Sequence, residues 1–70
     1  VSTRRAELHQ AESAALLARR TLDREQGLVK SGASTAQMLD DNRARREQAD
    51  SAVERARQVL ARVEAEEAQI

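Results

Sequence analysis

The placement of proline and glycine most constrains what this chain can fold into. Of its 70 residues none is proline, and the only two glycines are Gly27 and Gly32. These are the residue types that most strongly interrupt a helix. Long uninterrupted segments therefore lie on both sides of residues 24–40, and this central segment is the one place where a helix is expected to break.

An apolar or small residue recurs every seven positions on both sides of the central segment, with further apolar residues at intervening positions. Such a repeat predicts a helix that packs along a second helix through a narrow seam. Because both halves carry it, we expect an all-α fold, a two-helix antiparallel coiled-coil hairpin. The seam consists of Leu8, Ala11, Ala15, Ala18, Leu22 and Val29 in the first half, and of Asn42, Ala49, Ala52, Ala56, Val59, Val63 and Ile70 in the second, flanked there by Val53 and Leu60.

The helix boundaries follow from local chemistry. We expect a first helix over about 3–30, a turn over about 31–34 and a second helix over about 35–70. Gly32 suits the left-handed conformation that follows many helix C-termini, and Lys30 suits the negative end of the helix dipole. A connection this short makes the two helices antiparallel neighbours.

Several details of the turn have two interpretations. Ser34, with Gln37 three residues later, fits a capping box, while Thr35 is the competing N-cap. Gly27 either loosens the end of the first helix or allows another backbone to approach. Met38 either contacts a partner or closes the seam.

Three leucines, at positions 16, 17 and 28, fall outside the seam. They either widen the apolar stripe for contact with additional neighbours or are isolated exposed side chains, which are common on protein surfaces.

Composition argues against several classes of function. The chain has no aromatic residue and no cysteine, so it cannot bury a sizeable core or enclose a cavity. Its 12 basic and 12 acidic residues cancel, which argues against nucleic acid and anionic membranes as partners. No apolar run approaches the roughly 20 residues of a membrane span. His9, the single histidine, has no converging ligands, and we expect no catalytic residue, metal or cofactor.

The central segment resembles the hairpin tip of periplasmic adaptor proteins, the membrane fusion proteins of the HlyD type. Members of that family have Arg, Leu and Ser where this chain has Arg24, Leu28 and Thr35, and a similar segment where it has residues 32–40. This chain departs from the pattern at three positions: Ser34 replaces an apolar residue, Thr35 replaces serine, and Met38 replaces an acid.

The resemblance implies a connective function. Such adaptors bridge an inner-membrane efflux or secretion transporter, of the ABC, RND or MFS class, to a TolC-like outer-membrane channel in Gram-negative bacteria. It implies that Arg24, Leu28 and Thr35 dock onto the channel and that sister hairpins pack side by side in a homo-oligomer. The chain would be periplasmic and a fragment of a larger protein anchored at the inner membrane, a view that fits the helical pattern still running at Ile70. The supporting turn would comprise Lys30, Gly32, Ser34, Gln37 and Met38.

Two other functions compete with docking. A generic coiled-coil interaction or spacer module would depend on the long seams and not on the tip. A nucleic-acid-binding helical arm would use the arginines of the second helix, at positions 43, 45, 46, 55, 57 and 62.

Overall fold

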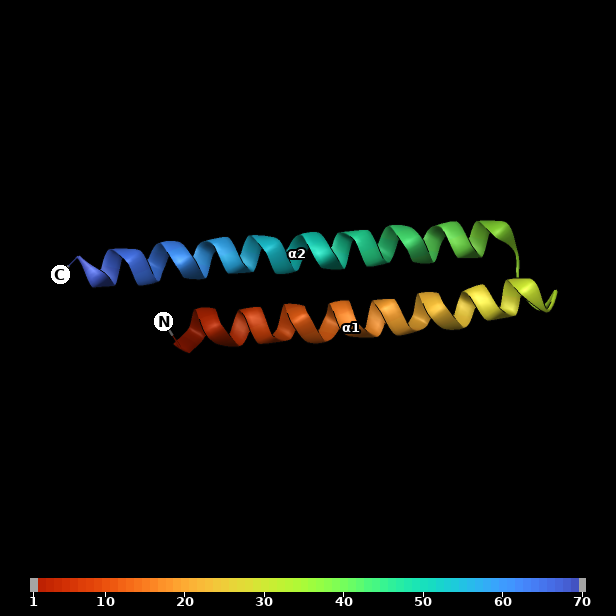
Figure 1. The fold of residues 1–70 in the computed structure, drawn as a ribbon, viewed down its shortest axis with the longest axis horizontal. Coiled ribbons are helices and arrows are strands. Elements are labelled where there is room, and N and C mark those ends of the chain that lie inside the picture. Colours follow the sequence, from red (N-terminus) through yellow and green to blue (C-terminus); the bar gives the residue numbers. More distant parts are fainter. Residues whose placement is uncertain (1, 70) are drawn as a thin grey trace.

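The computed structural model describes residues 2–69, which form two antiparallel helices joined by a short turn (Figure 1). Helix α1 spans Ser2–Lys30 and helix α2 spans Ala36–Ala68. Together they make a rod with principal extents of 58 × 15 × 11 Å. The all-α hairpin expected from the seven-residue repeat is therefore confirmed. Ile70, expected at the end of the seam, lies outside the described residues.

The two helices are offset along the axis of the rod. At the tip, the end of α1 and the turn project past the start of α2, and at the opposite end α2 projects past the start of α1 (Figure 1). The apex is therefore built from the last turn of α1 and the residues that follow it. Neither of the described helices is long and apolar enough to cross a membrane.

The core is a seam one side chain wide. Its buried apolar residues are Ala15, Leu22 and Val53, and the other predicted seam positions within the described residues are mostly half-buried. One detail of the prediction is wrong, because Val53 belongs to the seam itself and does not merely flank it. Val53 lies four residues after Ala49 and three before the next seam alanine, so it satisfies the helical period as well as Ala52 does. Its larger side chain has more apolar area to bury.

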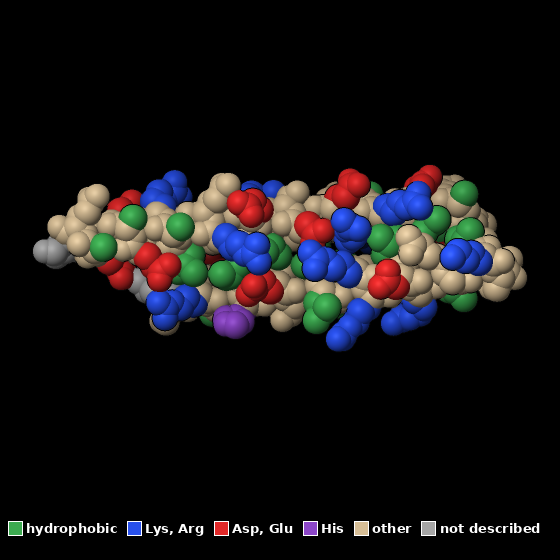
Figure 2. Space-filling model, viewed as in Figure 1, with side chains coloured by type: hydrophobic (Ala, Val, Ile, Leu, Met, Phe, Trp, Pro, Cys, Tyr) green, Lys and Arg blue, Asp and Glu red, His purple; other side chains and the backbone are tan. Residues whose placement is uncertain are grey.

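Three ion pairs connect the helices on the surface beside this seam, and they follow each other at intervals of seven residues. They are Arg5 with Glu64 at 3.1 Å, Glu12 with Arg57 at 3.7 Å, and Arg19 with Asp50 at 3.0 Å between nitrogen and oxygen. Figure 2 shows positive and negative side chains interleaved along the visible face of the rod, with apolar side chains between them. Exposed pairs of this kind contribute about 0.2–1 kcal/mol each, so they add little to the stability of the hairpin.

Candidate functional site

The end of α1 is closed by a Schellman motif. Gly32 has φ of +80°, the left-handed conformation predicted for it. Its N–H donates to the carbonyl of Val29 at 3.1 Å, and the N–H of Ala33 donates to the carbonyl of Leu28 at 2.8 Å. These two hydrogen bonds satisfy carbonyls that the helix leaves unpaired at its end, and they turn the chain back toward α2.

The backbone of Leu28 is held at this turn while its side chain faces solvent. Its carbonyl accepts a second hydrogen bond, from the hydroxyl of Ser31 at 2.9 Å. Leu28 is 39% exposed, which is less than Leu16 and Leu17 in the middle of α1 but leaves apolar surface in contact with water. The tip thus presents an apolar side chain from a well-defined backbone position.

Arg24 lies one helical turn before Leu28, so the two side chains share a face of α1. Arg24 is exposed, and none of the salt bridges among residues 2–69 involves it. Its planar guanidinium is able to make forked hydrogen bonds to a carboxylate or to backbone carbonyls of another molecule. A cation and an apolar side chain therefore stand together near the apex.

Thr35 is the N-cap of α2. Its backbone is extended, with φ of −117° and ψ of 160°, and its Oγ1 accepts a hydrogen bond from the N–H of Met38 at 3.2 Å. The alternative of a capping box between Ser34 and Gln37 is wrong, because the hydroxyl of Ser34 is directed to α1 instead. Since Thr35 uses only an oxygen lone pair in the cap, its hydroxyl hydrogen remains able to donate to a partner.

Glu25 receives the hydrogen bond from the hydroxyl of Ser34 through its Oε1 atom. The side chain of Glu25 is buried, with 9% of its surface exposed. The sequence analysis missed this residue, although a signal was present: position 25 continues the series of seam positions formed by Ala11 and Ala18. A charged residue at a seam position indicates that its side chain has a hydrogen-bonding partner.

A second buried polar residue supports the start of α2. Asn42 is 6% exposed, and its Nδ2 donates to the carbonyl of Met38 at 2.9 Å. The prediction that Asn42 enters the seam is confirmed. Met38 itself is exposed, so it does not close the seam. Gly27 has no atom within 4 Å of where a Cβ would lie, so close approach of another backbone does not explain this glycine.

The remaining residues predicted at the turn lie on its surface. Lys30 is exposed in the last turn of α1, where its charge opposes the negative end of the helix dipole. Gln37 is exposed in the first turn of α2. The structure therefore gathers Arg24 and Leu28 on one side of the turn and Thr35 at the start of the other helix.

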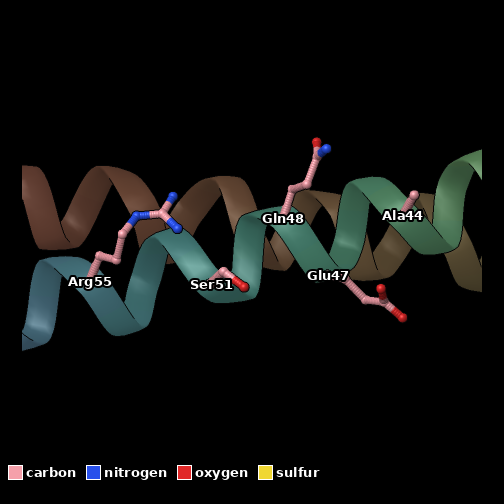
Figure 3. Close-up of a pocket in the computed structure, with 5 residues that line it drawn as sticks. All are labelled: Ala44, Glu47, Gln48, Ser51 and Arg55. Atoms are coloured by element: carbon pink, nitrogen blue, oxygen red, sulfur yellow. The ribbon is translucent and has the colours of Figure 1, made fainter.

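The rod offers little to a small ligand away from the tip. A surface depression lies on α2 alone, and the side chains around it diverge into solvent (Figure 3). Within residues 2–69 no three metal-ligating side chains gather in a way that could hold an ion. The residues lining the depression are Ala44, Glu47, Gln48, Ser51 and Arg55.

Comparison with known protein families agrees with the helical-hairpin fold. No curated protein and no solved structure matches the chain significantly. A protein family described as "RND MFP, alpha-helical hairpin domain" matches residues 1–70. Because that match covers the whole chain, the chain belongs to the family of alpha-helical hairpin domains of RND membrane fusion proteins.

Proposed function

We propose that this hairpin docks tip-first onto the periplasmic end of a TolC-like outer-membrane channel. It would act within an adaptor of the HlyD type that bridges the channel to an inner-membrane transporter, and the family description favours the RND class. The observation that carries the proposal is the exposed pair Arg24 and Leu28, which share a face of α1 close to the turn.

Each of the three tip residues has a distinct chemical role in the proposed contact. Leu28 fills an apolar groove on the channel, where its burial removes apolar surface from water. Arg24 binds carboxylate or carbonyl oxygens with its guanidinium. Thr35 donates its hydroxyl hydrogen to a channel acceptor while its oxygen continues to cap α2.

The long sides of the rod are the proposed contact surfaces between sister hairpins. Leu17 is 62% exposed and lines a furrow between the helices. Side-by-side packing of several copies would bury this leucine and place several tips on one channel. Multiple weak tip contacts would then act together, because each additional contact becomes intramolecular. The furrow is lined by Ala14, Leu17, Ala18, Thr21, Asn42 and Arg45.

The proposed location is the periplasm, with the parent protein anchored at the inner membrane. This hairpin would not itself insert into a bilayer, which agrees with the polar character of both helices. Its function would be to connect proteins mechanically and not to catalyse a reaction.

A binding experiment with two aspartate variants tests the site. The hairpin is immobilised densely, so that multivalent contact compensates for weak single contacts, and the purified channel is passed over it. Leu28→Asp and Arg24→Asp should abolish capture of the channel, while circular dichroism shows unchanged helicity. Leu16→Asp is the matched control, since it places the same charge on an exposed leucine of α1 that lies outside the furrow, and it should retain capture.

Two results would overturn the tip as the docking site. Equal capture by the wild type and Leu28→Asp would move the interface to the sides of the rod, as the generic coiled-coil alternative requires. Absence of capture by densely displayed wild type would contradict channel docking altogether. The nucleic-acid alternative is disfavoured because the charges of the chain cancel and three of the six arginines in question, Arg43, Arg46 and Arg57, pair with carboxylates.

A further inference from the structure

The carboxylate of Glu25 lies in a position that packing alone would assign to an apolar residue. It continues the seam of α1 seven residues after Ala18, and 9% of the residue is exposed. Burial of a carboxylate is costly even when it is hydrogen-bonded, and apolar replacements at such positions are often neutral or stabilising. Seam stability therefore does not explain a glutamate here, whereas a directional hydrogen bond does.

That hydrogen bond joins α1 to the turn at one specific place. Ser34, whose hydroxyl donates to Glu25, immediately precedes the N-cap Thr35. The bond closes a loop over residues 25–34, which contains Leu28 and the whole Schellman motif. It is the one side-chain hydrogen bond among the described residues that ties the turn to the α1 seam; the Ser31 bond stays within the last turn.

The consequence concerns the relative placement of the two halves of the tip. Arg24 and Leu28 belong to α1, whereas Thr35 belongs to the start of α2. Without the bond from Ser34, only the backbone of the turn and the packing of α2 along the seam relate Thr35 to α1. With that bond, Ser34, which adjoins Thr35, is hydrogen-bonded to Glu25, which adjoins Arg24.

We propose that Glu25 and Ser34 are positioning residues that hold the tip in the geometry required for docking. They act through Arg24, Leu28 and Thr35, and Glu25 itself is too buried to touch the channel. The inference rests on the proposed docking function, which it deepens by assigning what fixes the spacing of the three contact side chains.

Glu25→Leu separates positioning from simple stabilisation. This variant removes the acceptor but makes the seam apolar, so the hairpin should resist urea at least as well as the wild type. It should nevertheless lose about fivefold in affinity for the channel, the size expected for one lost hydrogen bond. A residue with a merely structural role would move stability and affinity in the same direction.

Companion variants complete a double-mutant cycle. Ser34→Ala should also weaken docking about fivefold, and the double variant should dock no more weakly than the poorer single variant, because both changes remove the same bond. Glu25→Gln is the matched control, since its amide oxygen still accepts from Ser34, and it should dock within about twofold of the wild type. Additive losses in the double variant would contradict the proposal.

A measurement without the channel tests the positioning role of Glu25 and Ser34 separately from docking. In Glu25→Leu, amide hydrogen exchange should accelerate at Ala33 and Met38, whose N–H groups bond within the tip, and remain unchanged in the middle of both helices. Unchanged exchange at the tip together with wild-type affinity would overturn the positioning role. If the wild type fails to bind the channel, the proposed docking function is wrong. Amide exchange at the tip still decides whether Glu25 holds the turn.

Discussion

Glu12 of α1 and Arg57 of α2 form the middle of the three cross-helix ion pairs, and their charges are reversed relative to the pairs seven residues away on either side. This alternation has a consequence for register. If α2 slipped by seven residues in either direction, Glu12 would face Glu64 or Asp50. A repeat of alanines tolerates such a slip, but the charge pattern opposes it, because each slipped arrangement brings like charges together.

Reversal of one member of this pair should therefore weaken the hairpin. We expect Glu12→Arg to lower the free energy of unfolding by about 1 kcal/mol, because an attraction across the helices becomes a repulsion. Adding Arg57→Glu should restore most of the loss, since the double variant recreates an opposite pair. Urea denaturation followed by circular dichroism measures both values. Failure of the second change to restore stability would show that the pair does not couple the helices.

The two glycines should respond to alanine in opposite directions. Gly27 lies inside α1 with open space around it, so Gly27→Ala should raise the free energy of unfolding by about 0.5–1 kcal/mol. Gly32 also has open space, but its φ of +80° is strained for alanine, and Gly32→Ala should cost about 1 kcal/mol. Thermal unfolding of the two variants makes the comparison. Equal shifts in the same direction would contradict the assigned conformation at one of them.

Leucine truncations should separate the seam from the surface. Leu22 is 5% exposed, and Leu22→Ala should destabilise the hairpin by about 2–3 kcal/mol through lost burial and a residual cavity. Leu17→Ala at an exposed position should change stability by less than about 0.5 kcal/mol. Chemical denaturation at low protein concentration is the suitable measurement, because it avoids self-association. A large loss from Leu17→Ala under those conditions would mean that this leucine packs within the single hairpin.

The N-cap assignment predicts a contrast between two replacements of Thr35. Thr35→Val keeps the shape of the side chain but removes the acceptor for the N–H of Met38, so it should cost about 1 kcal/mol. Thr35→Ser keeps the hydroxyl and should be close to neutral. Hydrogen exchange at the Met38 amide reports the same bond directly. If Thr35→Val left that amide as protected as before, Thr35 would not be the cap.

The general architecture was predictable because it depends on local and periodic features. The seven-residue repeat predicts two helices with one seam, and Gly32 and Lys30 have the chemistry of a helix end. The position of the turn and the left-handed glycine could therefore be assigned before any coordinates. These features depend on residues that are adjacent or one helical turn apart. For such residues, the spacing in the sequence determines how the side chains lie relative to one another.

The details of the tip depended on contacts between residues distant in sequence. Ser34 and Thr35 both have the hydroxyl that an N-cap requires, and the choice follows from where Glu25 lies on the opposite helix. The sequence determined that Glu25 falls at a seam position, but only the packed hairpin brings the donor from nine residues away that allows its carboxylate to be buried. Local chemistry specified the helices and their ends, whereas the assignment of polar partners at the tip required both helices to be in place.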